Sequence, residues 1–355
     1  MKSMKQWLRM GFLAAMAVGG WCVLSPLTPP QDAASPPASS AKNPAALGAP
    51  ERREYTLLFT GDVMLSRAVG SLMADQKDWS LPFHLIADTL RSADLRYCNL
   101  ECPVSDRGSN LHHLYSFRAD PRTIEGLKVT GFNVVSQANN HAYDWGPEAL
   151  LDSLQRLRAA GIHTVGAGQN ILAAHYPLLV NVGGLRIAFL AYVDIDPKEA
   201  AAGVDRPGVA WLDPAQALAD IQFARPLADL VIVCPHWGVE YALQPTRDQV
   251  ELAHRMIDAG ADMIVGSHPH VVQPLENYRD HWIAYSLGNF VFDQENPVAH
   301  RGMMLKATVR DKHITGVAPL RIEINSRFQA TLTPTADHPI KPLLAERKPL
   351  LHSAP

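Results

Sequence analysis

The chain has 355 residues, of which 47% are hydrophobic and 19% charged, and this balance is typical of a globular protein with a buried core. Its formal net charge of −3 offers no broad basic surface, so the composition argues against nucleic acid as a partner. The length allows one large domain or two medium ones.

The N-terminal segment, residues 1–24, has the pattern of an export signal. Lys2, Lys5 and Arg9 precede an apolar run that extends to Leu24. A run of about 14 apolar residues fits a signal h-region better than a complete span, which needs about 20. No A-x-A site follows it, which slightly favours an uncleaved signal anchor over a cleaved signal peptide. Either way the charge pattern places the rest outside the cytoplasm, at the cell membrane if anchored and secreted or periplasmic if cleaved.

Residues 25–53 are rich in Pro, Ala and Ser and lack periodicity. Such a segment cannot bury enough apolar surface to offset its ordering entropy, so we expect a linker. The first 24 residues hold three basic side chains and no acidic one, so the remainder has a formal charge of −6, three units below the whole chain's −3. The folded domain is predicted at 54–334 and a flexible tail at 335–355.

From residue 55 onward, apolar strand-like runs alternate with helical patterns, which predicts an α/β fold. The expected strands cover 55–60, 95–100, 132–138, 163–166, 185–193, 230–235, 263–266 and 281–286. Helices are expected at 147–160, with Leu150, Leu151, Leu154 and Leu157 on one face, and at 246–259, which opens with a Thr-x-x-Gln box. Three later strands, at 303–309, 314–324 and 328–332, predict an added antiparallel element.

Side chains that can bind a metal follow five of the expected strands. They are Asp62, Glu101, Asn140 with the adjacent His141, His236, and His268 with His270. Because the carboxyl ends of parallel strands form the ligand-binding edge of an α/β sheet, we expect these residues to converge. Carboxylate oxygens combined with imidazole nitrogens suit Zn, Mn or Fe better than a dedicated Mg or Ca cage. Each motif alone has an ordinary structural explanation, and it is their joint occurrence that predicts a metal centre.

Other chemically capable residues are expected to be structural. Cys98 and Cys102 each flank a candidate ligand segment, and two small buried residues are favoured over a disulfide between them. The histidines that lack a strand-end context are expected to be surface or packing residues: His112, His113, His175, His254, His281 and His300.

A set of motifs occurs in order over about residues 55–295: TGDVMLSR, NLE, FRAD, GFNVVSQANNHAYDWG, GAGQN, PHWGVEY, GSHPHVVQ and YSLGNFVFD. Together they resemble the CapA family of poly-γ-glutamate capsule synthesis proteins. That family is regarded as a variant of the calcineurin-like metallophosphoesterase fold. The resemblance therefore implies an α/β/β/α sandwich, here with added C-terminal antiparallel strands, and a domain tethered outside the cytoplasmic membrane.

The resemblance also implies roles for the candidate residues. Asp62 corresponds to the first metal-binding aspartate, and Glu101 to the bridging carboxylate, which is usually Asp. Asn140 would bind the second metal, while His141 would protonate or stabilise the leaving group.

His236 matches the isolated histidine ligand of the family pattern. His268 would face the second metal and His270 the first. Met64 stands where the usual Asp-x-His motif has its histidine, and a thioether is a poor ligand for a hard divalent ion. We therefore expect one firm metal and a second that is weaker or absent.

Four further residues are candidates for secondary roles. Arg67 and Arg118 can hold an anionic substrate group through their bidentate forks, or can equally form structural ion pairs. Glu240 can orient a metal-bound histidine or pair with Arg247. Asn289 is expected to cap a turn rather than touch substrate.

The leading functional hypothesis is an exported, membrane-associated hydrolase in which Asp62 and His141 act with a metal-activated water. Its substrate would be an anionic phosphoester or amide of capsule, poly-γ-glutamate or another envelope polymer, or its precursor. The alternative is a non-enzymatic assembly or export subunit that binds polyanion or membrane capsule-synthesis partners. A third hypothesis is an amidase or peptidase of the cell wall.

Overall fold

A computed structural model describes residues 54–333 of the chain. The predicted signal segment at 1–24, the linker at 25–53 and the tail at 335–355 lie outside the described residues, so these three assignments remain predictions. Within the described part of the chain, no helix combines the length and apolar character required to cross a bilayer.

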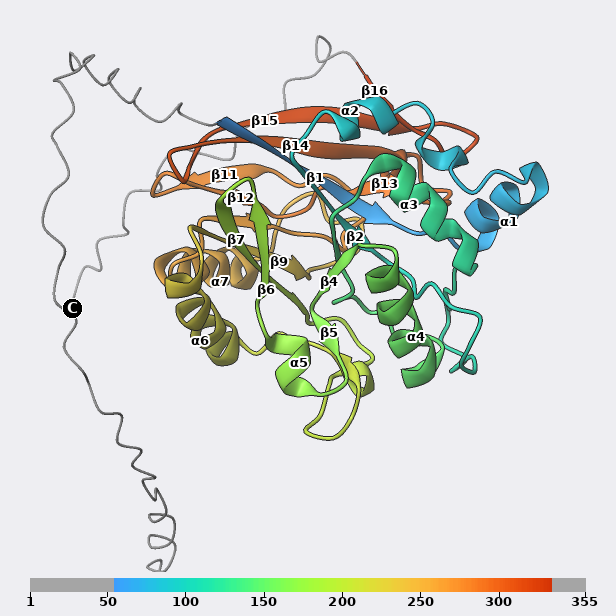
Figure 1. Cartoon of the computed structure of the whole chain (residues 1–355), viewed down its shortest axis with the longest axis horizontal. Helices are drawn as coiled ribbons and strands as arrows, with labels where there is room; N and C mark the ends of the chain where they lie inside the picture. Colours follow the sequence, from blue (N-terminus) through green and yellow to red (C-terminus); the bar gives the residue numbers. More distant parts are fainter. Residues whose placement is uncertain (1–53, 334–355) are drawn as a thin grey trace, which may run out of the picture. The chain divides into compact units, whose positions relative to one another are not determined.

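The first sheet has eight strands, and β1 lies at its centre (Figure 1). In spatial order they are β16 (Ala330–Leu332), β15 (His313–Ile324), β14 (Arg301–Arg310), β1 (Glu54–Val63), β2 (Leu95–Leu100), β3 (Val134–Ser136) and β4 (His163–Val165), with β13 (Asn289–Val291) beside the end of β1. Strands β1 to β4 run parallel, whereas β14 to β16 pair antiparallel and extend the sheet from β1. The predicted C-terminal antiparallel element is thus confirmed as a direct extension of this sheet.

The second sheet has six strands, in the order β11 (Leu275–Tyr278), β12 (His281–Ala284), β10 (Met263–Val265), β9 (Leu230–His236), β7 (Leu185–Val193) and β6 (Leu178–Val182). Its four central strands are parallel, and β11 and β6 are antiparallel edges. Two short strands, β5 (Ala167–Gly168) and β8 (Gly208–Val209), form a separate pair.

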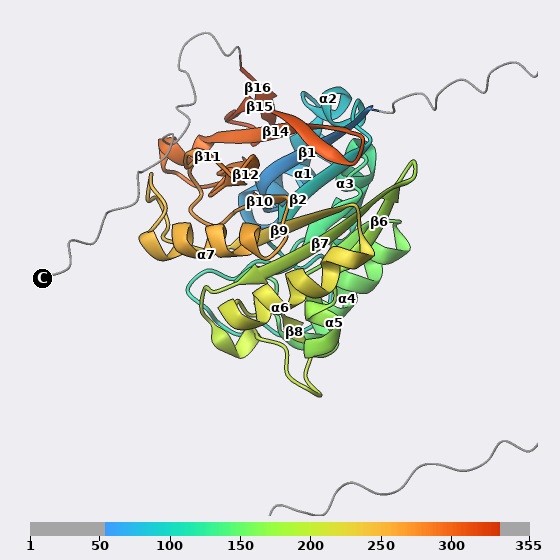
Figure 2. The same cartoon turned by 90° about the vertical axis from the view of Figure 1, so that its left-hand side faces the viewer.

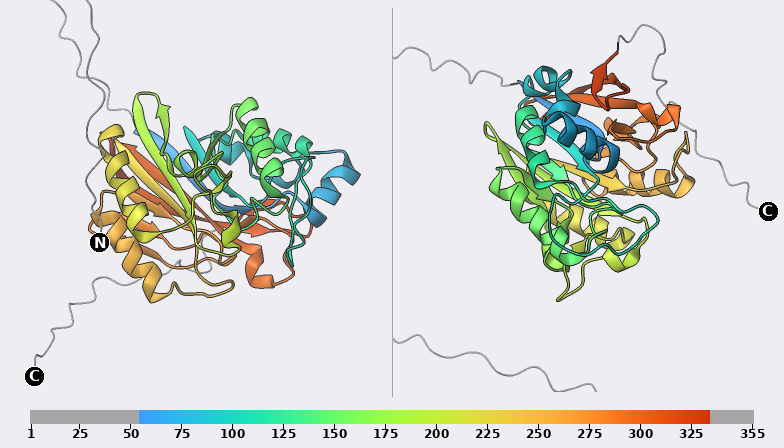
Figure 3. Two further views of the ribbon diagram at one scale, coloured as in Figure 1. Left: turned by 90° about the horizontal axis from the view of Figure 1, so that it is seen from below. Right: turned by 90° about the vertical axis from the view of Figure 1, so that its right-hand side faces the viewer.

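The two sheets pack face to face and are covered by helices on their outer faces, which gives four layers. One apolar core, with Phe59, Tyr97, Phe189 and Ile232, lies between the sheets. The first sheet is covered by four helices, α1 (Arg67–Gln76), α2 (Ala87–Arg91), α3 (Ile124–Thr130) and α4 (Gly146–Ala159). The second sheet is covered by α6 (Pro214–Ala224) and α7 (Arg247–Asp258). Helix α5 (Ile171–His175) is a single short turn. Figure 2 shows α6 and α7 over β7 and β9, and Figure 3 shows the layers from below. The predicted α/β/β/α sandwich is confirmed.

The two helices predicted from sequence show how local signals set their ends. Thr246 Oγ1 accepts from the N–H of Gln249 at 3.2 Å, and Gln249 Oε1 accepts from the N–H of Thr246 at 2.9 Å, so the predicted capping box starts α7. In α4 the buried face comprises Leu150, Leu154 and Leu157. Leu151 was predicted on the same face, but it is 37% exposed because it lies one residue beyond that stripe.

Candidate metal centre

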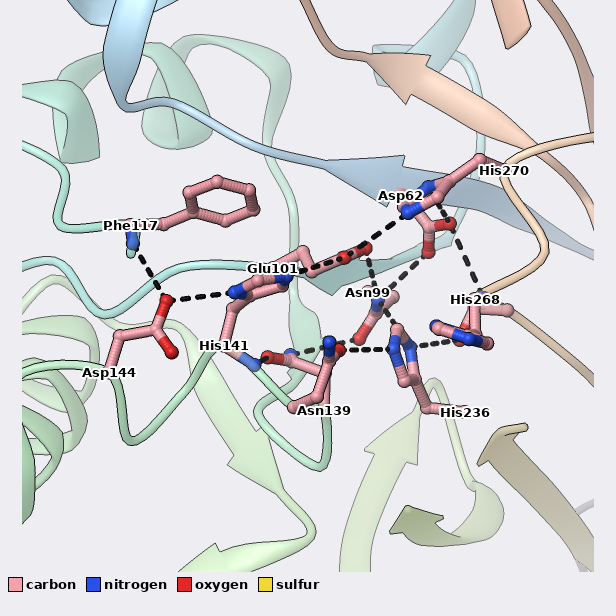
Figure 4. Close-up of polar contacts among 12 residues, drawn as sticks. Asp62, Asn99, Glu101, Phe117, Asn139, His141, Asp144, His236, His268 and His270 are labelled. Atoms are coloured by element: carbon pink, nitrogen blue, oxygen red, sulfur yellow. Dashed lines mark hydrogen bonds and ion pairs between the residues drawn. The ribbon is translucent and has the colours of Figure 1, made fainter. Parts of the chain in front are cut away.

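The polar strand ends of both sheets meet at one place, where β1, β2, β3, β9 and β10 finish (Figure 4). Hydrogen bonds, ring contacts and short N···O separations connect all of the predicted ligands, which are Asp62, Glu101, Asn140, His236, His268 and His270. They come together because parallel strands deliver their carboxyl ends to a common edge. Their roles as metal ligands remain proposals.

Three of these residues, Asp62, Glu101 and His236, form what we term the buried group. One donor atom from each lies within 4.8 Å of the others, and all three side chains are fully buried. The amide Nδ2 of Asn99 donates to Asp62 Oδ1 at 2.8 Å and lies 3.4 Å from Glu101 Oε2 and 3.2 Å from His236 Nδ1. Glu101 Oε1 is buried without a hydrogen-bond partner. An orphaned carboxylate oxygen beside a second carboxylate is a donor set suited to a cation.

The electrostatics of the buried group point the same way. Burial, followed by the nearby negative charge of Asp62, raises the pKa of Glu101 well above its ordinary value. Burial, followed by the proximity of His268, lowers the pKa of His236 well below its ordinary value. The pKa of His268 falls to about 3, chiefly through burial and then through His270. The two imidazoles are therefore neutral, as a divalent cation requires of its ligands, whereas the raised pKa of Glu101 means that a bound cation would displace the proton of that carboxyl group.

A second set of donors, Glu240, His268 and His270, forms what we term the outer group, because Glu240 is exposed. One donor atom from each again lies within 4.8 Å of the others. His270 connects the outer group to the buried one, since its Nδ1 lies 3.4 Å from Asp62 Oδ2 and its Nε2 lies 3.7 Å from Glu101 Oε1. Nδ1 of His268 is buried without a hydrogen-bond partner. The centre therefore offers two adjacent candidate cation sites.

Asn140 and Met64 differ in what they contribute. Asn140 Oδ1 lies 2.8 Å from Nε2 of His236, and the His236 and His268 rings are 4.8 Å apart, so these three residues lie together as the family pattern implies. Met64 is fully buried, and its sulfur accepts from the N–H of Ser66 at 3.1 Å. The thioether is therefore engaged within its own loop.

His141 is held in a fixed orientation beside these groups. Its Nδ1 lies 2.8 Å from Asp144 Oδ2, and its ring stacks on Phe117 with centroids 3.8 Å apart. Its Nε2 lies 3.9 Å from Glu101 Oε1. The same Asp144 carboxylate accepts from the N–H of Phe117 at 2.7 Å and lies 3.1 Å from Nδ1 of His113. The second nitrogen of the His141 imidazole therefore faces the Glu101 carboxylate.

The two candidate substrate arginines lie near this centre but are already engaged. Arg67 pairs with Asp293, and its guanidinium lies 4.6 Å from the ring centroid of Phe117, the residue stacked on His141. The guanidinium of Arg118 lies 3.5 Å from the ring centroid of Trp145 and donates to a backbone carbonyl. For Arg67 the ion-pair alternative describes the observed contact, and substrate binding by either arginine remains a proposal.

Residues 56–294 match the family described as bacterial capsule synthesis protein PGA_cap. This match covers more than half of the chain and includes every candidate ligand. The chain belongs to the PGA_cap family. The resemblance inferred from the sequence motifs is thereby confirmed.

Relatives of this PGA_cap protein include two Bacillus proteins. The capsule biosynthesis protein CapA of Bacillus anthracis is 34% identical over 290 residues, which span 78% of this chain and 69% of that protein. The PGA biosynthesis protein CapA of Bacillus subtilis (strain 168) is 38% identical over 242 residues, which span 66% of this chain and 63% of that protein. The chain thus spans roughly two thirds of the length of these relatives.

Solved structures are more distant from the PGA_cap domain. A hypothetical protein from Thermus thermophilus has a TM-score of 0.49 and 19% identity, and the match covers 76% of this chain and 99% of that chain. The Haemophilus influenzae NAD nucleotidase (NadN) has a TM-score of 0.45 and 12% identity, with coverage of 79% and 54%. The α/β/β/α assignment follows from the strand order of the PGA_cap domain and not from these structures.

Several residues of the PGA_cap centre were absent from the sequence-based candidates. Asn99 and Asp144 both lie within the recognised motifs. Asn99 stands two residues before Glu101, and side chains two apart on a strand point to the same face; Asp144 stands three residues after His141, a spacing that a turn brings together. Both spacings could have identified these residues. His113 was predicted to be a surface or packing residue. Its side chain is partly exposed, and its Nδ1 lies 3.1 Å from Asp144 Oδ1, so it packs against the carboxylate that holds His141.

Asn289 was expected to cap a turn, but its Nδ2 instead donates across the following loop, to Gln294 Oε1 at 2.9 Å and to the Ala299 carbonyl at 3.1 Å. Its Oδ1 lies 2.9 Å from Nδ1 of His270 and helps to orient that ring. Cys98 and Cys102 are buried free thiols, as favoured, and are not joined by a disulfide.

Proposed function

We propose that this domain is a metal-dependent hydrolase acting on an anionic phosphoester or amide of a capsule polymer of the poly-γ-glutamate class, or its precursor. The observation that carries the proposal is the buried group. Asp62 and Glu101 are fully buried side by side, and within residues 54–333 no lysine or arginine hydrogen-bonds to either carboxylate. Two buried carboxylates need compensating charge, and His236 is held neutral. The names of the Bacillus relatives support the polymer class.

The ligands proposed for bound divalent cations, Mn, Zn or Fe, are drawn from the six converging residues: Asp62, Glu101, Asn140, His236, His268 and His270. Such a cation supplies, when bound, the Lewis acidity that activates water and offsets the negative charge of the substrate. Because Met64 is turned onto its own loop, we propose that a cation held by the buried group is firm and that any second cation is weaker.

His141 is proposed to give a proton to the leaving group. The Asp144 carboxylate accepts the Nδ1 proton at 2.8 Å, so Nε2 is the nitrogen that exchanges a proton with substrate. Phe117 covers one face of the ring and limits its rotation. The guanidinium of Arg67 also lies against Phe117. We propose that it attracts an anionic substituent of the substrate through donors that it does not use for Asp293.

Elemental analysis and activity measurements on the purified full-length protein test this proposal. We expect stoichiometric metal in the wild type and at least about tenfold weaker metal binding in His236→Ala and His268→Ala, since even outer-shell partners of a metal are worth that much. His254→Ala is the matched control, because His254 lies on α7 and bonds to Glu276 at 2.9 Å. Metal content that is equal in wild type and both centre variants would refute the assignment.

A second candidate function is a non-enzymatic assembly or export subunit that binds polyanion or membrane capsule-synthesis partners. The diversion of the Met64 sulfur favours it, because a two-cation hydrolase needs a complete set of ligands. Metal-loaded protein that binds polyglutamate, yet cleaves neither polyglutamate nor phosphoesters with Mn or Zn added, would establish this alternative.

The basic residues and apolar run of the first 24 residues support a further part of the proposal, that the chain is exported and held at the cell membrane. Fractionation of cells that express the full chain is the test. Recovery of the intact chain with membranes, with the domain sensitive to external protease, is expected. Recovery in the cytoplasmic fraction would contradict it.

A further inference from the structure

Residues 239–242 form a tight turn that presents Glu240. The N–H of Ala242 donates to the carbonyl of Val239 at 3.2 Å, so Glu240 and Tyr241 are the two central residues of the turn. Tyr241 has a φ of 61°. This left-handed conformation is unfavourable for a bulky residue and is usually taken by Gly or Asn at that position. The turn therefore keeps a strained shape with the Glu240 carboxylate at its tip.

The turn is fixed against the loop that carries the paired histidines. The N–H of Tyr241 donates to the Pro269 carbonyl at 2.8 Å, and Nε2 of Gln273 donates to the Ala242 carbonyl at 2.8 Å. The loop is itself strained, because φ is 100° at His268 and 59° at His270. Strain of this kind persists where the surrounding structure over-determines it, and it concentrates at functional sites.

The chemistry presented by the two loops is a donor set for a divalent cation. A carboxylate oxygen of Glu240 and one nitrogen each from His268 and His270 lie within 4.8 Å of one another. Nδ1 of His268, a side chain only 4% exposed, has no hydrogen-bond partner. Glu240 accepts no hydrogen bond and forms no ion pair among residues 54–333. Of the two roles expected for it, pairing with Arg247 is not observed, because Arg247 pairs with Glu251. Two imidazoles and one carboxylate suit Mn, Zn or Fe.

Met64 gives this arrangement its significance. The family pattern leads one to expect a histidine at that position, but the Met64 sulfur is engaged by the N–H of Ser66. The residues at the strand ends therefore supply one ligand fewer around His270 than the family pattern implies. Glu240, from a turn after β9, brings a carboxylate to the same histidine.

We propose that the outer group is a second cation site, in which Glu240 replaces the ligand lost at Met64. The inference rests on the proposed function, because it adds a second cation to one held by the buried group. Its ligand is Mn²⁺, Zn²⁺ or Fe²⁺. Because Glu240 is exposed while His268 and His270 are buried, the site has one face toward solvent.

Titration of the full-length, chelator-stripped protein with Mn²⁺ tests the inference, with free Mn²⁺ counted by its electron paramagnetic resonance signal. The test variants are Glu240→Gln and His236→Ala. The control is Glu125→Gln, because Glu125 is an exposed glutamate on α3. We expect two Mn²⁺ with a spin-coupled spectrum for wild type and for E125Q. E240Q retains one Mn²⁺ with an uncoupled spectrum, and its second binding constant is weaker by at least about tenfold.

The possible outcomes separate the two proposals. Identical stoichiometry, affinity and spectrum in wild type and E240Q overturn the role of Glu240. A wild type with a single Mn²⁺ that H236A removes and E240Q does not affect refutes the outer site while the proposed function stands. A wild type that binds no Mn²⁺ at all overturns both. Because Glu240 is exposed, E240Q is expected to fold, and circular dichroism checks this.

Discussion

Nδ1 of His141 lies 2.8 Å from Oδ2 of Asp144, and this contact decides which nitrogen of the imidazole faces the centre. The carboxylate is itself fixed by the Phe117 N–H, 2.7 Å away. A histidine with one nitrogen tied to a buried carboxylate has a defined tautomer and a defined orientation. The pair therefore links the loop after β3 to the proton-transfer step of the proposed hydrolysis.

Replacement of Asp144 by Asn tests that link. The amide can present its NH2 group to Nδ1, which places the single proton of a neutral imidazole on Nε2, and it no longer supplies the negative charge that stabilises the imidazolium; a neutral imidazole is a far weaker acid toward a leaving group. We expect kcat for the polymer or phosphoester substrate to fall by about 10²- to 10⁴-fold, with the alkaline limb of the pH–rate profile displaced and the metal content unchanged. His113→Ala, which removes the other imidazole on Asp144, should cost far less. Equal kcat and pH profile in D144N and wild type would contradict the role.

The convergence of the ligands could be predicted from sequence because it follows from strand direction alone. Asp62 is the residue before the last of β1, and His236 is the final residue of β9. Strands of this apolar character are parallel and share an edge, so the motifs at their ends must meet. The four-layer architecture came instead from the family resemblance, since alternating strands and helices fit several α/β folds.

The contacts that organise the centre in detail could not be predicted in the same way. Glu240 reaches His268 and His270 only because its turn hydrogen-bonds to Pro269, which is a pairing of two loops without a periodic signal. Arg67 was correctly placed near the centre, but its partner Asp293 lies 226 residues further on. Side-chain partners at such separations depend on packing that no local pattern specifies.

Glu101 provides a test of the charge balance in the buried group. Its folded-state pKa is raised, so the metal-free protein gains stability below the unfolded pKa of about 4.3 and loses it as pH rises toward the folded value. Glu101→Gln should remove this loss and stabilise the metal-free protein at pH 7. It should also abolish the stabilisation that added Mn²⁺ gives the wild type, which is about 2.7 kcal/mol at a hundredfold excess over Kd.

Urea unfolding with and without chelator, from pH 4 to pH 8, measures both effects of Glu101→Gln. Asp106→Asn is a suitable control, because Asp106 is an exposed carboxylate that pairs with Arg156 at 2.7 Å. If E101Q protein is stabilised by Mn²⁺ as strongly as the wild type, Glu101 is not a ligand.

Gly61 connects the packing of β1 directly to the position of Asp62. A methyl group at Gly61 would overlap the carbonyl oxygen of Gly288, which accepts from the N–H of Asp62 at 3.0 Å. Gly61→Ala should therefore push β1 away from this loop, lower stability by about 1–3 kcal/mol and weaken metal binding. Gly316→Ala is the matched control, since a methyl group there meets nothing within 4 Å. Calorimetry with metal titration measures both, and wild-type metal affinity in G61A would contradict the coupling.

Asp229 joins the two sheets away from the centre, and it sets part of the acid stability. Its carboxylate accepts from the backbone N–H of Arg186 at 2.9 Å and from Nζ of Lys312 at 3.0 Å, so it ties β7 to the turn between β14 and β15. These bonds, those of Arg186 first, lower the folded-state pKa of Asp229 below its ordinary value. Its stabilisation is therefore complete above the unfolded pKa of about 3.9, declines below that pH and is lost as the pH falls through the lowered folded-state pKa.

Asp229→Ala should lower the free energy of unfolding at pH 7 by about 1–3 kcal/mol, because the Arg186 N–H loses its buried acceptor. The difference between D229A and wild type should shrink as the pH is lowered from 5 toward 2. Lys312→Ala should cost less than about 1 kcal/mol, since the Lys312 side chain is 63% exposed and its ion pair is screened by solvent. Denaturant titrations across this pH range decide the point. A D229A deficit that is the same at pH 2 as at pH 7 would show that packing, and not the carboxylate's charge, accounts for the loss.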